Sequence, residues 1–330
     1  FLGGPGATGI LAFKKELYTN KVPDNPGGGT VDWTNPWGEH KYVDDIEARE
    51  DGGTPAFLQT IKTALAIQLK DKMGVKNILA REHELSEIIW STVHEGGHGL
   101  YEQGLKIENY GLPAGEFVSL GIHESQSRIW ENNIGRALPW WEHMYPILQA
   151  QFPNQLKGFS LIDFYKSMNV VESSLVRTSA DELTYHIHVL IRYEIEKSLM
   201  EGEVEIVDLE ELWNSKYQEY LGVTPSKPSE GVLQDIHWSH GSLGYFPTYS
   251  LGSLYAAQFY AQAEKDILGL PLQLESGNVD VFLKLMRKNI HQHGKLYTAE
   301  QLCEKFTGEP LNIAHFVKYA KEKYRGIYGV

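Results

Sequence analysis

The chain has 330 residues, enough for one large domain or two smaller domains with a substantial core. Thirty Lys and Arg residues stand against 43 Asp and Glu, and the net charge of −13 argues against nucleic acid and anionic membranes as partners. The single cysteine, Cys303, excludes an internal disulfide and, with no signal peptide and no bilayer-length apolar stretch, predicts a cytoplasmic protein.

The first 83 residues have a composition typical of turns and loops, with clusters of Gly, Pro and Asn at 3–6, 23–29 and 33–38. One helix is predicted there, because Thr54 can serve as N-cap, Pro55 suits the first turn, and apolar residues recur at helical spacing up to Leu69. We therefore expect an atypical or shortened N-terminal segment over 1–83 and the main domain over 84–330.

Helical periodicity dominates the rest of the chain and predicts a mainly α fold with minor short β elements. A capping box formed by Thr298 and Gln301 predicts the start of a further helix. Residues that favour extended chain suggest short strands within 107–120 or 170–178. The predicted helices cover residues 84–105, 122–136, 139–151, 161–168, 181–201, 208–220, 250–267 and 277–291.

The most informative motif is a His-Glu-x-x-His pattern at residues 94–98, inside the first of these helices. His94 and His98 are four residues apart and share one helix face, so both imidazoles can bind one divalent metal. The carboxylate of Glu95 stays free to accept a proton from water. Gly96 and Gly97 each cost about 1 kcal/mol in a helix interior, which suggests a close approach by another part of the chain. The pattern is typical of zinc peptidases.

A catalytic zinc site usually has a third protein ligand, and Glu124 is the candidate. Its 26-residue separation from His98 can hold the end of the first helix, a loop with Gly111, Pro113 and Gly115, and the start of a second helix. A glutamate at a helix start is otherwise a common solvated charge. The sequence therefore predicts zinc bound by the two histidines and Glu124, with cobalt or manganese as substitutes.

Four ordered motifs resemble those of the carboxypeptidase Taq-type metallocarboxypeptidases, also called the M32 peptidases. The resemblance covers roughly residues 84–330, whereas 1–83 lacks the family's His-Pro-Phe and Asp-x-Arg-x-Thr signatures and is shorter than the family's N-terminal portion. The motifs are His94-Glu95-Gly96-Gly97-His98, His123-Glu124-Ser125-Gln126, Val176-Arg177-Thr178-Ser179-Ala180-Asp181 and Gly231-Val232-Leu233-Gln234-Asp235-Ile236-His237-Trp238.

This resemblance implies a helical zinc-peptidase fold with a central substrate cleft, a homodimer, and a metallocarboxypeptidase of broad specificity acting on peptides with a free C-terminus. By the same resemblance, Arg177 would bind the substrate's terminal carboxylate and His237 would face the substrate. For Arg177 the alternative is a structural ion pair with Asp181. For His237 the alternative is a core histidine held by Asp235.

Less specific signals surround these residues. Tyr245 is preferred to Tyr249 as a phenol that stabilises the tetrahedral intermediate, although packing is an equal alternative for both. Asp181 is expected to orient a ligating imidazole. His186 and His188 are two residues apart on a helix, so they point to different faces and are interpreted as packing residues or as supports of the metal ligands, not as a second metal site.

Three alternative functions stay open. A non-enzymatic protein that uses the helices only as a binding surface is the least favoured, because it gives no reason for Glu95 beside His94. A metallo-oligopeptidase would share the metal ligands and Glu95 but would cleave internal bonds of short peptides. A shortened zinc-binding scaffold would bind metal and show little activity, because a missing wall of the cleft would no longer exclude water and position peptide.

Overall fold

The computed structural model describes residues 18–23, 26–50 and 75–329, together with isolated positions between 14 and 72. For residues 75–88 it describes the backbone alone. The chain divides into two compact units, Phe1–Glu84 and Leu85–Val330, and each is considered separately. Most of the helix predicted from Thr54 to Leu69 lies outside the described residues.

In the N-terminal unit, the described residues form an antiparallel hairpin of β1 (Val31–Thr34) and β2 (His40–Tyr42), followed by α1 (Ile46–Glu50). The turn between the strands is held by Asn35, whose side-chain oxygen accepts hydrogen bonds from the backbone N–H groups of Trp37 at 3.1 Å and Glu39 at 3.0 Å. The turn chemistry predicted for residues 33–38 therefore connects two strands that the sequence analysis did not expect.

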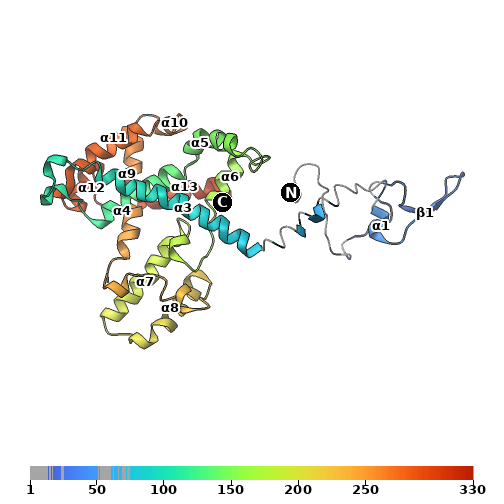
Figure 1. The fold of residues 1–330 in the computed structure, drawn as a ribbon, viewed down its shortest axis with the longest axis horizontal. Helices are drawn as coiled ribbons and strands as arrows, with labels where there is room; N and C mark the ends of the chain where they lie inside the picture. The colour runs from blue at the N-terminus through green and yellow to red at the C-terminus, as the bar shows by residue number, and fades with distance from the viewer. Residues whose placement is uncertain are drawn as a thin grey trace. The chain divides into compact units, whose positions relative to one another are not determined.

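The C-terminal unit is helical (Figure 1). Two of its helices begin at capping boxes, formed at Ser160 and at Thr298, and the second was predicted from the sequence. The α-helices are α3 (Val75–Glu102), α4 (Leu120–Arg128), α5 (Leu138–Gln151), α6 (Leu161–Met168), α7 (Thr184–Met200), α8 (Leu209–Leu221), α9 (Pro247–Asp266), α10 (Leu270–Glu275), α11 (Asp280–Asn289), α12 (Ala299–Thr307) and α13 (Ala314–Tyr328).

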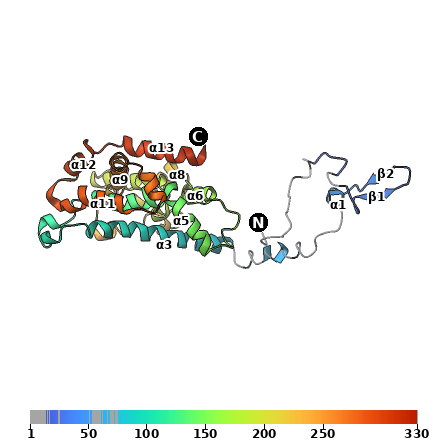
Figure 2. The ribbon, with the colours of Figure 1, turned by 90° about the horizontal axis from the view of Figure 1, so that it is seen from above.

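The main core of this unit surrounds α4 and α9, which pack closely along each other. Ile122 of α4, Phe259 of α9 and Phe282 of α11 are fully buried within it. Figure 2 shows α3 along one face of the unit and α13 along the opposite face, with α9 and α11 between them. Gly97 of α3 lies against the backbone of Gln126 and Ser127 in α4.

A smaller core joins α7 to α8 through Ile191, Ile195, Trp213 and Tyr217. In Figure 1 these two helices lie apart from the helices of the main core, and α9 extends from one group to the other. Phe246, just before α9, packs with Tyr185 and Val189 of α7 in a third cluster. The start of α9 is therefore fixed to α7 while its remainder belongs to the main core.

Several predicted elements need correction. Residues 107–119 and 170–178 form single turns of 3-10 helix and irregular chain, residue 120 begins α4, and the structure has no strand within 107–120 or 170–178. The helix predicted over 122–136 is α4 followed by a π-helix, η4 (Ile129–Gly135). Helices α10 and α13 were not predicted. Within the part of the chain that the structure describes, no helix is both long and apolar enough to cross a membrane.

Candidate metal centre and active site

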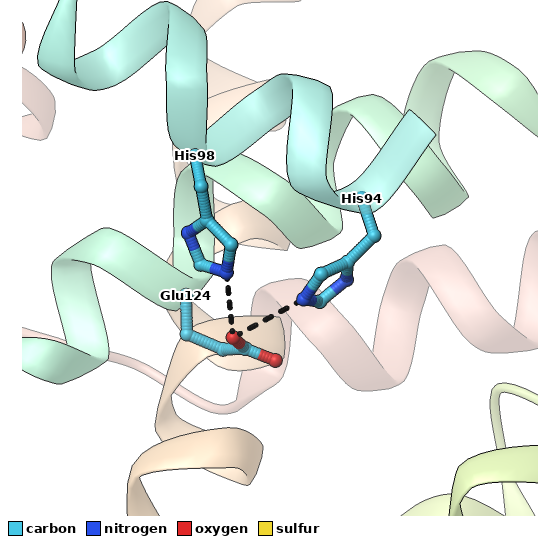
Figure 3. A group of neighbouring side chains, drawn as sticks. All are labelled: His94, His98 and Glu124. Atoms are coloured by element: carbon cyan, nitrogen blue, oxygen red, sulfur yellow. Dashed lines mark ion pairs between the residues drawn. The ribbon is translucent and has the colours of Figure 1, made fainter. Parts of the chain in front are cut away.

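Helices α3 and α4 bring the three predicted metal ligands together (Figure 3). His94 and His98 extend from successive turns of α3, and Glu124 extends toward them from α4. Oε2 of Glu124 lies 3.5 Å from Nε2 of His94 and 3.5 Å from Nε2 of His98. The three donor atoms all lie within 4.8 Å of one another.

These distances fit a tetrahedral zinc site. Bonds of about 2.0–2.1 Å to nitrogen and oxygen place neighbouring tetrahedral ligand atoms about 3.3–3.4 Å apart, close to the 3.5 Å separations of the carboxylate oxygen from both imidazoles. Two imidazoles and one carboxylate also form a common donor set of catalytic zinc sites, which leaves one position for water.

Two glycines allow α3 and α9 to pack closely against α4. A Cβ on Gly97 of α3 would lie 2.6 Å from the backbone oxygen of Gln126, and a Cβ on Gly252 of α9 would lie 2.3 Å from Cγ of Glu124. Such contacts are too short for any side chain, so only glycine fits at either position. By contrast, a Cβ on Gly96 would contact nothing within 4 Å. The close approach predicted for the two motif glycines is therefore found at Gly97 alone.

A second carboxylate, Glu131, orients the imidazole of His94. Its Oε2 lies 2.9 Å from Nδ1 of His94, so Nδ1 donates to the carboxylate while Nε2 faces Glu124. The prediction that Asp181 has this role is wrong. The carboxylate of Asp181 accepts hydrogen bonds from the backbone N–H groups of Leu183 and Thr184 at the start of α7.

The imidazole of His98 is oriented through a second histidine. Nδ1 of His98 lies 2.5 Å from Nδ1 of His123, and Nε2 of His123 lies 2.9 Å from Oε1 of Glu102. When Nε2 of His98 is free for a metal, its Nδ1–H donates to His123, which in turn donates to Glu102. No local pattern in the sequence indicated this relay.

Arg128 contacts both carboxylates at the centre. Its Nε donates to Oε1 of Glu124 at 2.9 Å and its Nη1 donates to Oε2 of Glu131 at 3.1 Å. Burial raises the pKa of Glu131, but Arg128 and His94 outweigh this effect and hold it at about 2. Burial also lowers the pKa of His94, but Glu124 and Glu131 raise it to about 9 in the metal-free chain. Burial opposes ionisation of Glu124 too, but Arg128 and the two histidines hold its pKa well below its usual range. Both carboxylates are therefore ionised at neutral pH.

Glu95 lies beside His94 on α3 and is exposed, in contrast to buried Glu124. Among the described residues it forms no ion pair. Its carboxylate thus remains accessible to solvent and substrate.

Arg177 lies in a buried cluster with Asp235, Arg192 and Gln234. Its Nη2 donates to Oδ1 of Asp235 at 2.7 Å, and Arg192 donates to Oδ2 of the same carboxylate at 2.6 Å. The alternative ion pair of Arg177 with Asp181 is therefore replaced by one with Asp235. Two guanidinium groups share a single carboxylate, so these three side chains carry one surplus positive charge.

His237, Tyr245 and Tyr249 pack beside this cluster. Nε2 of His237 lies 2.9 Å from the hydroxyl of Tyr249, and the His237 and Tyr245 rings are 5.3 Å apart. Nδ1 of His237 is buried, has no hydrogen-bond partner among the described residues, and lies 3.9 Å from Oδ1 of Asp235. Tyr249, rather than Asp235, holds this imidazole.

Tyr185 connects the metal ligands to the arginine cluster. Arg128 lies over its ring at 4.1 Å, and its hydroxyl accepts a hydrogen bond from Nη1 of Arg177 at 2.9 Å. Burial raises the pKa of Tyr245, and the negative charge of Glu124 raises it further. Burial likewise raises the pKa of Tyr249, and the charge of Glu124 adds to this effect.

Sequence comparison relates this site to a known family. The sequence model described as carboxypeptidase Taq (M32) metallopeptidase matches residues 78–324, three quarters of the chain. The chain belongs to the M32 metallopeptidase family. The resemblance predicted from the four motifs is thereby confirmed.

Several M32 relatives show how far the similarity extends. Thermostable carboxypeptidase 1 of Thermus thermophilus is 46% identical over 241 residues, 73% of this chain and 47% of the relative. Carboxypeptidase 1 of Bacillus subtilis is 41% identical over 75% of this chain and 49% of the relative. The crystal structure of the M32 carboxypeptidase from Deinococcus radiodurans R1 superposes with a TM-score of 0.71 at 40% identity, covering 73% of this chain and 49% of that one. The chain spans about half the length of these relatives.

A different family matches the N-terminal part. The class-V aminotransferase model matches residues 2–101, which overlaps the beginning of the M32 match. A probable cysteine desulfurase of Staphylococcus epidermidis is 31% identical over 113 residues, 33% of this chain and 24% of the relative. The N-terminal segment thus resembles a family other than M32.

The two histidines of α7 lie in separate buried environments in the M32 part of the chain. Nδ1 of His186 lies 3.0 Å from the hydroxyl of Ser250, whereas Nδ1 of His188 lies 2.9 Å from the hydroxyl of Tyr217. Burial lowers their pKa values to about 4 and about 3, so both are neutral at pH 7. They point to different neighbours, as predicted.

Proposed function

We propose that this chain acts as a zinc metallocarboxypeptidase that releases amino acids from the C-terminus of peptides with broad specificity. One observation carries the proposal: His94 and His98 on α3 turn their Nε2 atoms toward one oxygen of Glu124 at tetrahedral spacing, with Glu95 beside them. Membership in the M32 family and the names of its relatives support the peptidase activity.

His94, His98 and Glu124 would hold the metal, for which zinc is the first choice and cobalt or manganese are possible substitutes. The bound metal would polarise a water molecule and the scissile carbonyl. Glu95 would accept the proton of the attacking water and return it to the leaving amine, because its carboxylate is adjacent to the ligands and free of ion pairs within the described residues.

Recognition of the substrate's carboxylate is assigned to Arg177 and His237. The surplus positive charge of the Arg177, Arg192 and Asp235 cluster would be neutralised by a terminal carboxylate. The unpaired Nδ1 of His237 supports a contact with substrate. Tyr245 is assigned to stabilisation of the tetrahedral intermediate, supported by its ring contact with His237 and its electrostatic coupling to Glu124.

One observation favours the second candidate, a metallo-oligopeptidase that cleaves internal bonds. Arg177 is only 5% exposed and already donates to Asp235 and Tyr185. A guanidinium committed to these partners binds a second carboxylate less well than a free one. An oligopeptidase needs no such contact and would retain the same metal ligands and Glu95.

The decisive experiment combines metal analysis with hydrolysis of two peptides of one sequence, one with a free C-terminus and one amidated. We expect about one zinc per chain, release of free amino acids from the unblocked peptide, and loss of activity with a chelator. Glu95→Gln should keep the metal and lose hydrolysis by several orders of magnitude. Equal cleavage of both peptides at internal bonds would support the oligopeptidase, and metal binding without turnover would support the inactive scaffold.

The proposal extends to compartment and assembly. A single buried cysteine and the acidic net charge support a cytoplasmic protein without nucleic-acid or membrane partners. A homodimer is proposed from the family resemblance, and apolar residues exposed on the described surface, such as Ile107 and Val207, provide area for an interface.

A further inference from the structure

The two carboxylate oxygens of Glu124 have different partners. Oε2 faces Nε2 of both His94 and His98, and the hydroxyl of Ser127 lies 3.3 Å from the same oxygen. Oε1 accepts the Nε–H of Arg128 at 2.9 Å. One oxygen is thus available to a metal and the other is held by a guanidinium.

Arg128 makes a second contact that couples it to His94. Its Nη1 donates to Oε2 of Glu131, the same oxygen that accepts from Nδ1 of His94. The Arg128 side chain is 12% exposed, and the ring of Tyr185 covers it at 4.1 Å. A single rigid guanidinium therefore fixes the carboxylate ligand and the carboxylate that orients one imidazole ligand.

Coordination number depends on how the carboxylate binds. A carboxylate with both oxygens free can bind a metal through two oxygens, which would add a fifth ligand atom beside two imidazoles and a water. A carboxylate whose second oxygen is hydrogen-bonded binds through one oxygen and leaves a four-coordinate site.

We propose that Arg128 is a positioning residue that keeps Glu124 a one-oxygen ligand and so keeps the metal centre four-coordinate, with water as the fourth ligand. This inference rests on the proposed metal-binding function. Arg128 touches neither metal nor substrate, so its effect should appear in the coordination geometry of the metal before any effect on substrate is considered.

The test uses the full chain loaded with cobalt, whose visible absorption distinguishes four-coordinate from five-coordinate sites. We expect Arg128→Met to weaken the cobalt absorption relative to the parent chain and to lower metal affinity about 10–100-fold in chelator competition. Arg128→Lys keeps the charge but cannot bond both carboxylates in one plane, so it should show a smaller spectral change. Arg128→Lys becomes the test of the proposal if circular dichroism shows that Arg128→Met does not fold.

Arg136→Met provides the matched control, because Arg136 is a second partly buried arginine whose Nη2 lies 3.5 Å from Oε1 of Glu131. Within the described residues Arg136 has no contact with Glu124, so the cobalt spectrum of the Arg136→Met variant should equal that of the parent chain. A folded Arg128 variant with the parent's cobalt spectrum overturns the inference while leaving the proposed function intact. A parent chain that binds no cobalt or zinc would instead remove the proposed function itself.

Discussion

Gly252→Ala should displace the proposed metal ligand Glu124, although the two residues are 128 positions apart in the sequence. In the structure, an added Cβ at Gly252 would lie 2.3 Å from Cγ and 2.6 Å from Cβ of Glu124. The contact also includes the Glu124 backbone carbon at 3.1 Å, so rotation of the side chain alone cannot relieve it. Reaching ordinary contact at 3.4 Å requires Cγ to move by about 1.1 Å, the difference between these two distances.

This displacement sets the expected size of the effect. Overpacking of a buried interface costs about 1–3 kcal/mol of folding stability, and a shift of about 1 Å in an active site can cost about 100-fold in activity. We therefore expect Gly252→Ala to lower both the free energy of unfolding and the metal affinity, with peptide hydrolysis reduced about 100-fold.

Gly121→Ala is the matched control at the same interface of α4 with α9. A Cβ on Gly121 would lie 3.6 Å from Cβ of Leu251, an ordinary contact, and alanine should gain about 0.5–1 kcal/mol over glycine in a helix. Thermal unfolding, chelator competition and peptide hydrolysis would be measured for both variants. If Gly252→Ala retained the parent's metal affinity and stability, the close packing of α9 against Glu124 would not control the metal centre.

Three further predictions concern recognition, pH and assembly. Arg177→Ala should lower kcat/KM on free peptides by a factor that corresponds to a loss of about 2–4 kcal/mol of transition-state stabilisation, while zinc content stays unchanged. Equal rates on free and amidated peptides, both unaffected by the substitution, would contradict carboxylate binding. Burial lowers the pKa values of His188 and His291 to about 3 in the folded chain, so between pH 6.5 and 3 only the unfolded chain takes up these protons. The stability present above pH 6.5 should then fall by about 2 kcal/mol per histidine at pH 5, and identical urea midpoints at pH 7.5 and 5 would refute this assignment. Sedimentation should detect a dimer at micromolar concentration, whereas monomer alone would contradict the assembly proposed from the family.

The sequence predicted the parts of the site that depend on local spacing. His94 and His98 lie on one face of α3 because four residues make about one helical turn. The capping box at Thr298 likewise depends on residues three apart, and it forms as predicted. Glu124 could be chosen only together with the His-Glu-x-x-His motif and its spacing from His98, since nothing local distinguishes a metal ligand from a solvated charge near the start of a helix.

The hydrogen-bond partners of the ligands depend on packing between helices, which spacing does not reveal. Glu131 is 37 residues from the imidazole it orients, and it belongs to a π-helix that the helical periodicity of residues 122–136 did not indicate. Asp181 was expected to orient an imidazole because carboxylates commonly have this role beside a metal, whereas its position at the start of α7 commits it to backbone N–H groups.

The arginine cluster shows how such packing bears on function. Asp235 is held by both Arg177 and Arg192, so Arg177→Ala would leave an ion pair of one carboxylate with one guanidinium. Because that pair is charge-balanced, the variant should lose the surplus positive charge without leaving an unpaired buried carboxylate. The substitution therefore separates the two candidate functions: a carboxypeptidase loses the charge that attracts its substrate's terminus, whereas an oligopeptidase loses only a buried side chain.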